Sequence, residues 1–507
     1  MTYKTLKVLV PDTVHFHEKN FKSLMGFFLR HNITLTKNDE VNSWASLYGD
    51  YSTKLVELQP YLAQLKRVKK TDLFEFSYKN INVWAIARAE LLTWFLPKIE
   101  FNIHIAEKND KDHFKLMYAI NEGVVANCYA AVMFFLDYWK KKLASIRVQS
   151  HALIYSGSQI YNRTLLEVLK HSQTTPIVME HFFTGNEYYF EERYTPIANS
   201  TDLRHAYYKP EKSIEYDRLR IKATNKVLKS NNRNVKKTGD HLNINFESGK
   251  TVGLIGQVVN DYSIIETATN YLNSVAFYKE FITKSTTNGI NVVFKAHPWE
   301  KHKDNVRTSF TKDMLEQWAE TELTAEQQAR LIITESVDMD CIFNQVDYVV
   351  GLCSQGLLEA CFEGFKPVQF GNAFYSGRSF TNDYALIDSF ISAVNEMKIN
   401  GTLGLDEYKR FEDFLVEALE KQLISVHKSG ILSIENKLKA YPLIPLVENR
   451  SHLPQKITHQ EIETALSSKV IVNSYPNKKL KKLKNDPKSF LKDSNYGFLR
   501  ALSKAVS

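Results

Sequence analysis

Short apolar runs rich in β-branched residues alternate with helical stretches along most of this chain of 507 residues. In the C-terminal half the runs recur at a regular spacing, at 251–257, 290–298, 331–335, 347–352 and 366–371. In the N-terminal half they occupy 6–10, 151–156 and 176–180. Neighbouring parallel strands need a crossover connection, usually a helix, so this alternation predicts an α/β fold built on parallel sheets.

A polar segment at 229–250 separates the two halves and predicts a domain boundary. We predict an N-terminal domain at 1–235, a linker at 236–250, a C-terminal domain at 251–450 and a helical, basic tail at 451–507. The aromatic stretches 73–96 and 123–139 predict a helical insert in the first domain. Two Rossmann-like domains that face a cleft form the architecture called GT-B, which is the fold class we predict.

The composition limits the class of protein and its compartment. With 44% hydrophobic and 24% charged residues, the chain is neither disordered nor fibrous. Its four cysteines have neither the density of a disulfide scaffold nor the spacing of a zinc site, which indicates a reduced, cytoplasmic compartment. The N-terminal apolar run is too short for the core of a signal peptide, so export is not expected. The stretch 123–139 is shorter than the ~20 residues of a membrane span and contains Asn127 and Asp137, so it predicts a buried helix.

The formal net charge of +8 is concentrated at the C-terminus. Residues 478–507 contain eight Lys and one Arg against two Asp, a net charge of +7, which leaves +1 for the rest of the chain. Basic segments with interspersed Leu and Phe lie on anionic membrane surfaces, so we predict a peripheral protein on the inner face of the cytoplasmic membrane. The alternative is a solvated tail that packs back on the body. A nucleic-acid partner is not expected, because the Lys cluster has no interleaved aromatic residues and the body is nearly neutral.

Ligands of open parallel sheets bind beyond the carboxyl ends of the strands, so the polar residues at these points are the candidate site. After the run 347–352, Ser354 is a natural N-cap and Gly356 allows a close backbone approach, which suits a phosphate at the N-terminus of the next helix. Glu359 lies about one turn after Gln355, where it could accept hydrogen bonds from a ribose. The alternative for this segment is an ordinary capped helix.

Two more groups follow strands of the same predicted sheet. Lys295 and His297 could contact a phosphate or a carboxylate, although a histidine at a strand end is often structural. Gln257, Asp261 and Ser263 follow the run 251–257. Asp261 is either the cap of the next helix or a carboxylate above the interdomain cleft, and the spacing does not separate these two interpretations.

In the N-terminal domain, Glu180 and His181 come at the end of an apolar run and are followed by aromatic residues that could wall a sugar site. A carboxyl group in such surroundings has a raised pKa and can act as a general acid or base. The alternative is a solvated glutamate in a loop. Ser158, Asn162 and Arg163 follow a small-residue turn and could form the opposing face.

Taken together and in this order, three segments resemble the bacterial capsule-polysaccharide biosynthesis family and its β-Kdo glycosyltransferases. They are GQVVNDYS, KAHPWE and QVDYVVGLCSQGLLEACFEGFKPVQFGNAFYSGRSFTND. The resemblance covers about 145–385 and is weaker over 1–144. The sequence departs from the family's pattern at Cys353, where Ser or Thr is common, and at Arg378 and Ser379, where a Trp-Gly pair is expected.

The resemblance implies that the chain transfers Kdo, an acidic sugar, from CMP-β-Kdo with retention of configuration. The implied acceptor is a saccharide of a lipid-linked surface polysaccharide, either O-antigen or capsule. By the same resemblance, Asp261 attacks the anomeric carbon and holds a covalent adduct, and Glu180 manages the proton of the acceptor hydroxyl. His297 is the third catalytic candidate. No metal or other cofactor is expected, because the family resembles GT-B enzymes that use dipoles and side chains instead.

The remaining site residues fall into two implied groups. The donor-binding group is Gln257, Ser263, Lys295, Ser354, Gln355, Gly356 and Glu359, and the acceptor-binding group is Ser158, Asn162, Arg163 and His181.

Other functions stay open for the same fold. The donor could be CMP-sialic acid or CDP-glycerol, or the chain could be a non-catalytic GT-B scaffold that binds polysaccharide. Catalytic groups must reach one sugar, so a separation of Asp261, Glu180 and His297 beyond ~15 Å would favour the scaffold.

Overall fold

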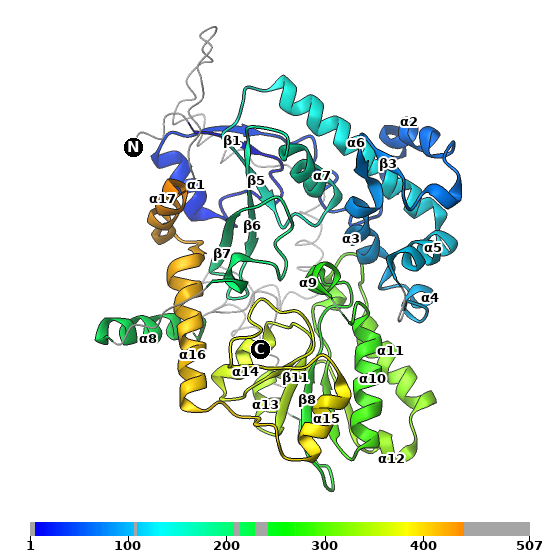
Figure 1. The fold of residues 1–507 in the computed structure, drawn as a ribbon, viewed down its shortest axis with the longest axis vertical. Coiled ribbons are helices and arrows are strands. Elements are labelled where there is room, and N and C mark those ends of the chain that lie inside the picture. The colour runs from blue at the N-terminus through cyan, green and yellow to red at the C-terminus, as the bar shows by residue number, and fades with distance from the viewer. Residues whose placement is uncertain (1–5, 106–108, 207–212, 229–241, 269, 441–507) are drawn as a thin grey trace, which may run out of the picture. The chain divides into compact units, whose positions relative to one another are not determined.

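The computed structural model describes residues 6–105, 109–206, 213–228, 242–268 and 270–440. These residues contain two six-stranded sheets with helices packed on them, and a short hairpin of β3 (Ser77–Tyr78) and β4 (Ile81–Asn82). Figure 1 shows β1, β5, β6 and β7 in one sheet and β8 and β11 in the other. The protein is therefore a mixed α/β protein whose sheets are mostly parallel, as the alternation of runs predicted.

The first sheet has the strand order β14-β7-β6-β5-β1-β2. Its parallel part consists of β1 (Lys7–Val10), β2 (Thr34–Lys37), β5 (His151–Tyr155) and β6 (Thr175–His181), so the three predicted N-terminal runs are strands. β7 (Glu187–Glu192) turns back and pairs antiparallel with β6. Val178 of β6 packs in the apolar cluster on one face, and Met179 packs in a separate cluster on the other. Because side chains alternate along a strand, Glu180 shares the face of Val178 and His181 that of Met179.

The helical insert lies between β2 and β5. Its helices are α2 (Leu55–Leu65), α3 (Val83–Phe95), α4 (Ile99–Asn102), α5 (Asp110–Ile120) and α6 (Glu122–Ser145). Trp139 of α6 is fully buried and donates its indole N–H to the Tyr161 carbonyl oxygen of α7 (Ile160–Leu169) over 2.7 Å. Among the described residues, no single helix is long and apolar enough to cross a bilayer; α5 and α6 pass that test only as a pair, and they are bent by 117°. The run 123–139 is thus part of a core helix, as predicted.

The second sheet is parallel throughout and has the strand order β10-β9-β8-β11-β12-β13. Its strands are β8 (Thr251–Ile255), β9 (Asn291–Lys295), β10 (Leu331–Thr334), β11 (Tyr348–Gly351), β12 (Val368–Gln369) and β13 (Asn382–Asp383). Its helices are α9 (Tyr262–Thr267), α10 (Ser274–Thr287), α11 (Phe310–Glu322), α12 (Ala325–Gln328), α13 (Met339–Phe343), α14 (Gly356–Phe362) and α15 (Ile387–Asn395). All five predicted C-terminal runs are strands of this sheet.

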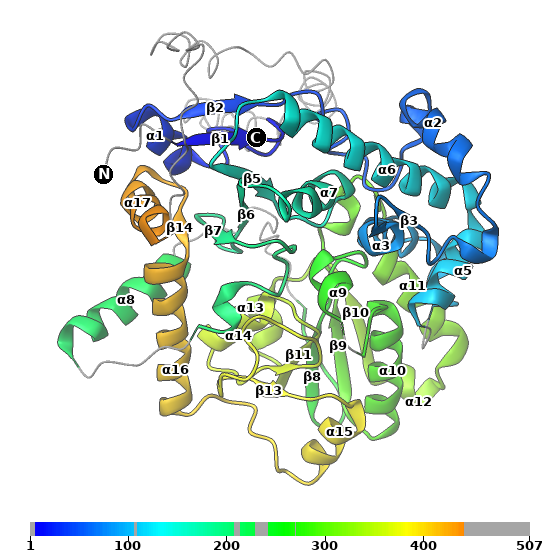
Figure 2. The same ribbon diagram turned by 45° about the horizontal axis from the view of Figure 1, so that its top comes forward.

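Helices cover both faces of the second sheet, as Figure 2 shows for α10 and α13. On one face, Tyr278 of α10 contacts Phe294 of β9 with ring centroids 4.8 Å apart. On the other face, Gly253 of β8 leaves room for α13, since a Cβ atom added to this glycine would lie 3.2 Å from Ile342. The second sheet is thus doubly wound, which leaves the carboxyl ends of its strands as the open edge.

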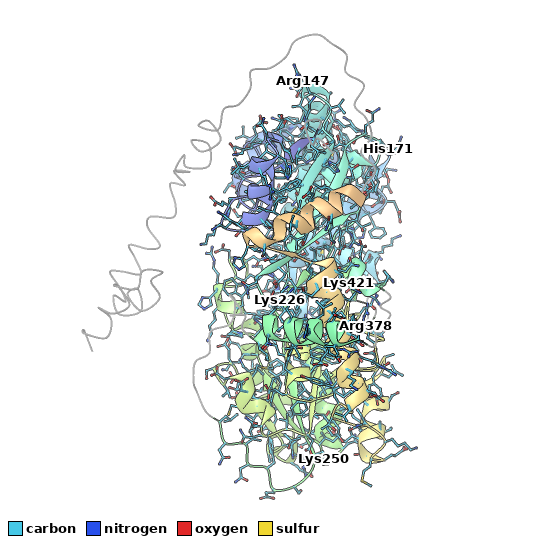
Figure 3. The ribbon with its side chains drawn as sticks, turned by 90° about the vertical axis from the view of Figure 1, so that its left-hand side faces the viewer. Arg147, His171, Lys226, Lys250, Arg378 and Lys421 are labelled. Atoms are coloured by element: carbon cyan, nitrogen blue, oxygen red, sulfur yellow. The ribbon has the colours of Figure 1, made fainter. Side chains whose placement is uncertain are left out.

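The last described elements return to the first sheet. After α16 (Leu405–Val416), β14 (Ile424–Ser425) pairs with β7, and α17 (Ile431–Ala440) packs against α1 (Lys22–Arg30). α16 also lies beside α8 (Ile214–Leu228), and Lys226 of α8, labelled in Figure 3, pairs with Glu420 over 2.6 Å. Part of the range 251–450 therefore pairs with the N-terminal sheet.

The other predicted domain limits, at 235, 250 and 450, stay predictions. The end of the predicted linker packs on the second sheet, where Ile244 donates its N–H to Gln345 Oε1 over 2.8 Å. The beginning of the linker and the whole basic tail at 451–507 lie outside the described residues.

Candidate active site

Gln257 connects the ends of two strands of the second sheet. It follows β8, and its side-chain oxygen accepts a hydrogen bond from the N–H of Cys353, which follows β11, over 2.9 Å. Its Nε2 atom lies 3.4 Å from both Asp261 Oδ2 and Ser263 Oγ. The Gln257 amide is buried, whereas Asp261 and Ser263 are partly exposed. The structure thus brings together Gln257, Asp261 and Ser263, which the sequence predicted at the end of one strand.

Asp261 caps α9. Its Oδ1 atom accepts a hydrogen bond from the Ser263 N–H over 2.8 Å, and this bond occupies one of the free amides of the first helical turn. The other oxygen faces Gln257, and the negative charge of the carboxylate also acts on Glu180 and His297. The two interpretations of Asp261 are therefore compatible, because one oxygen serves the helix and the other faces the open edge.

Glu180 stands at the carboxyl end of β6, in the other sheet. Burial raises the pKa of its carboxyl group to about 7, a hydrogen bond with Ser156 lowers that pKa, and the charge of Asp261 raises it. The side chain is partly exposed, so solvent or a substrate can reach it. A group with this pKa exchanges a proton readily near neutral pH, which is what general acid or base catalysis requires.

His297 is uncharged at neutral pH. Burial lowers the pKa of its imidazole to about 4, the charge of Asp261 opposes this shift, and the nearby Lys295 and Lys303 reinforce it. Its Nδ1 atom accepts a hydrogen bond from the Trp299 N–H over 3.2 Å. Because Nδ1 is an acceptor, the proton resides on Nε2, so His297 offers a neutral N–H donor at the end of β9.

Lys295 is committed to the backbone. Its Nζ atom donates to the carbonyl oxygens of Ala296, over 3.2 Å, and Glu335, over 2.5 Å. Burial lowers the pKa of its ammonium group to about 8. The negative charges of Glu335 and Asp338 act in the other direction and raise that pKa. Lys295 thus joins the ends of β9 and β10.

The predicted phosphate segment follows β11. Ser354 Oγ accepts a hydrogen bond from the Gly356 N–H over 3.2 Å, so Ser354 satisfies the first turn of α14 as a cap would. The Ser354 carbonyl oxygen accepts from the Tyr375 hydroxyl group over 2.5 Å. Gln355 and Glu359 are partly exposed at the same end of α14. The segment lies next to Cys353, which places it beside Gln257.

A small, shallow depression adjoins this segment. Residues of α9 and the ends of β11 and β12 line it, among them Ile264, Tyr271, Cys353, Phe370 and Asn372.

The four predicted acceptor residues do not form one group. Asn162 donates to the Tyr155 carbonyl oxygen over 2.8 Å, and Arg163 pairs with Glu266 of α9 over 2.6 Å. His181 stacks on Phe21 with ring centroids 4.9 Å apart, on the face of β6 opposite to Glu180. Ser158 is fully buried, and its hydroxyl group has no hydrogen-bond partner in the described part of the chain. Their role in acceptor binding stays a prediction.

Lys303 belongs to the same group as His297 and Asp261, although the motifs did not single it out. Its Nζ atom donates to Asn260 Oδ1 over 2.7 Å and to the Asn260 carbonyl oxygen over 3.1 Å. Burial lowers the pKa of this ammonium group to about 8, while the charges of Asp261 and Glu300 raise it. The sequence signal was the third lysine of KAHPWEKHK, which only the fold distinguishes from its exposed neighbours.

Glu300 is the second residue that the motifs missed. Its buried carboxylate accepts hydrogen bonds from the Val259 N–H and the Thr311 hydroxyl group, each over 2.7 Å. It thereby fixes the loop that carries Asn260 and Asp261.

The sequence was expected to have no Asp-x-Asp motif at a strand end, but such a pair, Asp338 and Asp340, begins four residues after β10. Within the described ranges, no three His, Cys, Asp or Glu side chains gather in a way that could hold a metal ion. The expectation of a metal-free site stays a prediction.

Comparison with known proteins bears on a central stretch of the chain, which contains part of the first sheet and the whole second sheet. Residues 170–399 match the family described as capsule polysaccharide biosynthesis protein. The resemblance drawn from the motifs is confirmed by this match, and the matched stretch contains Glu180, Asp261, His297 and Ser354. No curated protein matches the chain.

Three solved structures share distant likeness with this chain. Thermosulfurimonas dismutans KpsC, beta Kdo 2,4 transferase, is 16% identical, with 57% of this chain and 87% of that chain covered and a TM-score of 0.39. Thermosulfurimonas dismutans KpsC, beta Kdo 2,7 transferase, is 13% identical, with coverages of 60% and 89% and a TM-score of 0.34. The N-terminal domain of Candida albicans trehalose-6-phosphate phosphatase is 10% identical, with coverages of 86% and 96% and a TM-score of 0.31. These likenesses are too distant to carry a conclusion about function.

Proposed function

We propose that this chain, whose residues 170–399 match the capsule polysaccharide biosynthesis family, is a retaining glycosyltransferase that moves Kdo from CMP-β-Kdo to a saccharide acceptor. The observation that carries the proposal is the interaction of two carboxyl groups from different sheets. Asp261 follows β8 and Glu180 ends β6. Burial raises the pKa of Glu180 to about 7, and the charge of Asp261 also acts to raise it. Such a pair suits double displacement, because one carboxylate attacks while the other exchanges a proton.

In the first step Asp261 attacks the anomeric carbon of the donor. A bond forms between the carboxylate oxygen and that carbon, the bond from carbon to the phosphate oxygen breaks, and CMP leaves with the electron pair. The oxygen that faces Gln257 is the nucleophile, because the other oxygen is held by the Ser263 N–H. The product of this step is a glycosyl ester of Asp261.

In the second step the acceptor hydroxyl group attacks the same carbon. The ester bond breaks, Asp261 leaves as a carboxylate, and the hydroxyl proton moves to Glu180. While Asp261 is esterified it carries no charge, so one of the causes that raise the pKa of Glu180 is absent. The pKa of Glu180 is therefore lower in the intermediate than at rest, so a larger fraction of Glu180 is ionised when the acceptor must lose its proton.

The donor carries a phosphate and a carboxylate, and the second sheet offers several groups for these anions. His297 contributes a neutral N–H donor and Lys303 a positive charge beside Asp261. Ser354, Gln355 and Glu359 stand at the start of α14, within reach of a nucleotide at the end of β11. Hydrogen bonds and charges fixed in this way stabilise a departing phosphate without the reorganisation that water needs.

The family match supports a proposal for the acceptor, and the basic sequence of residues 478–507 supports one for the location of the enzyme. Capsule biosynthesis uses a surface saccharide, so we propose a lipid-linked oligosaccharide as the acceptor. The basic tail then holds the enzyme on the anionic inner face of the cytoplasmic membrane.

A donor screen tests the proposal. Purified protein is incubated with CMP-Kdo, CMP-sialic acid or CDP-glycerol, and the release of CMP, the leaving group of all three donors, is followed with and without a saccharide acceptor. Turnover of CMP-Kdo alone supports the proposal. Turnover of another donor replaces the donor assignment, and absence of turnover with every donor favours a non-catalytic scaffold.

Intact-protein mass spectrometry tests the covalent step. Incubation with CMP-Kdo in the absence of acceptor is expected to add the mass of one Kdo residue to the wild-type protein and nothing to the Asp261→Ala variant. A stable adduct on the Asp261→Ala variant would contradict the assignment of the nucleophile.

A further inference from the structure

Asp12 is a fully buried carboxylate at the carboxyl end of β1. Its Oδ1 atom accepts a hydrogen bond from the His15 backbone N–H over 2.7 Å and lies 3.1 Å from His15 Nδ1. Its Oδ2 atom accepts from the Tyr161 hydroxyl group over 3.1 Å. A buried carboxylate needs such partners, and here an imidazole supplies one of them.

The position of Asp12 fixes the tautomer of His15. A carboxylate only accepts hydrogen bonds, and the Tyr161 hydroxyl group, 3.2 Å from the same Nδ1 atom, uses its own proton for Asp12 Oδ2. From these contacts we infer that Nδ1 of His15 carries a proton and donates a hydrogen bond to Asp12. In the neutral ring Nε2 then has a free lone pair. Nε2 makes no hydrogen bond to the described part of the chain, and 15% of the side chain of His15 is exposed, against 0% for Asp12.

The ring of His15 is also held in its plane. It stacks on Tyr155 with ring centroids 4.3 Å apart and an interplanar angle of 9°. Tyr155 ends β5, and the charges of Glu180 and Asp12 both act on its hydroxyl group. The acceptor atom Nε2 is thus fixed by a carboxylate on one side of the ring and by an aromatic face beneath it.

The pair lies at the same carboxyl edge of the sheet as Glu180. Tyr155 packs with the cluster of Met179, on the face that carries His181, so His15 reaches the edge from the face opposite to Glu180. The strand order β6-β5-β1 puts Glu180, Tyr155 and Asp12 at the carboxyl ends of three adjacent strands. Adjacent strands are about 4.8 Å apart, so β1 and β6 are separated by roughly 10 Å, the span of a sugar residue with its hydroxyl groups.

We propose that Asp12 and His15 form a saccharide-binding site, in which His15 Nε2 accepts a hydrogen bond from a hydroxyl group of the acceptor. The proposal rests on the proposed function in that it takes the second substrate to be a saccharide. His15 binds the substrate, and Asp12 is a positioning residue that holds the imidazole in the accepting tautomer. The site lies outside the stretch 170–399 that matches the family.

Transfer kinetics test the site. The probes are the methyl glycosides of galactose, N-acetylglucosamine and Kdo as acceptors, with the donor that the screen selects. His15→Ala is expected to raise the KM of the acceptor about tenfold, the usual effect of one lost hydrogen bond, and to change the KM of the donor less than about twofold. His15→Gln, which keeps an acceptor atom, is expected to recover part of the loss, and Asp12→Asn to lose part of it.

His17→Ala is the matched control, because it removes another imidazole from the same loop. Its kinetics are expected to equal those of the wild type. An unchanged acceptor KM in His15→Ala overturns the proposal. An equal increase of donor and acceptor KM in His15→Ala and His15→Gln also overturns it, because that result indicates a purely structural role.

Nitrogen NMR of the histidine rings separates this proposal from the proposed function. The His15 signals are those absent from His15→Ala. They are expected to show a protonated Nδ1 and a bare Nε2 in the wild type, a mixture of tautomers in Asp12→Asn, and a shift of the wild-type Nε2 signal on addition of at least one glycoside. If no sugar nucleotide is turned over, the proposed function fails while this measurement still decides the site. Absence of a shift with every glycoside overturns the site.

Discussion

The carboxyl edges of the two sheets differ in how they hold charge. At the first edge, the carboxyl group of Glu180 has a pKa raised mainly by burial, to about 7. At the second edge, Asp261 is held by the Ser263 N–H at a helix N-terminus and is surrounded by His297 and Lys303. The first edge therefore suits proton exchange, and the second suits an ionised nucleophile and an anionic donor. The difference shows that two carboxyl groups acquire different chemistry from their surroundings and not from their residue type.

The largest expected effect comes from Asp261. Asp261→Ala and Asp261→Asn are both expected to lower the transfer rate by at least about 10³-fold, because neither side chain can form the glycosyl ester. The two variants differ in stability, since Ala also loses the cap of α9, which costs about 1 kcal/mol, whereas Asn keeps it. Transfer assays and thermal unfolding check both statements.

Thr324→Ala is the control for the lost cap. Thr324 caps α12 through its bond to the Gln327 N–H and belongs to none of the site residues. This variant is expected to lose a similar amount of stability and to transfer normally. Near-normal turnover of Asp261→Asn would remove Asp261 from the role of nucleophile.

The next effect comes from Glu180 and is visible in the pH profile. The ionised form of Glu180 is the base and acts while Asp261 is esterified, so kcat/KM of the acceptor is expected to rise with pH, with a midpoint below the resting pKa of about 7. Glu180→Gln is expected to lower the transfer rate by about 10²-fold or more and to abolish this acidic limb. A Glu180→Gln variant that keeps the limb would show that another group is responsible for it.

Lys303 is expected to control the alkaline limb. The pKa of its ammonium group is lowered to about 8 and the protonated form is the useful one, so kcat/KM is expected to fall as the pH increases through about 8. Lys303→Met is expected to lower activity about tenfold and to remove this limb. Lys295→Met is the matched comparison, because Lys295 also has a pKa of about 8 but donates to backbone carbonyl groups. If the alkaline limb disappeared in Lys295→Met and stayed in Lys303→Met, Lys295 and not Lys303 would be the group that controls it.

The smallest effect concerns the ion pair of Arg163 with Glu266, which joins α7 to α9. Arg163→Met is expected to destabilise the protein by about 1 kcal/mol and to leave both limbs of the pH profile in place. Lys70→Met removes an ion pair between side chains that are 71% and 55% exposed and is expected to leave the thermal midpoint unchanged. A pH profile altered by Arg163→Met would move this residue from the structural contacts to the acceptor site.

Strand positions could be predicted because burial imposes a local pattern. All eight predicted runs are strands, since strands buried on both faces are continuous apolar runs. The strands that the pattern missed are short or mixed, such as β2, where no residue is buried, and the two-residue β14. Pairing of β14 with β7 joins residues more than two hundred positions apart, which no local pattern contains.

The site could be predicted in part for the same reason. Asp261, His297 and Ser354 were found because each follows a strand of one sheet, and a parallel sheet brings such positions to one edge. Asp12 and His15 follow a strand too, but the sequence did not indicate them as site residues. What distinguishes them is the contact of His15 Nδ1 with the buried Asp12 carboxylate and the stacking of His15 on Tyr155, and both arise only in the fold. His181 was grouped with Glu180 as its neighbour in sequence, whereas alternation along β6 directs the two side chains to opposite faces.

The sequence by itself determined the α/β class, most of the strands and the motifs that match the capsule polysaccharide biosynthesis family, because these depend on local periodicity and on residues close together in the chain. Only the tertiary structure decided the protonation of the candidate site. The pKa of Glu180 is raised to about 7, that of His297 is lowered to about 4 and that of Lys303 is lowered to about 8, and the first cause in each case is burial. Burial and the proximity of Asp261 arise from packing between distant segments, and a charged group responds to that whole environment and not to its neighbours in the chain.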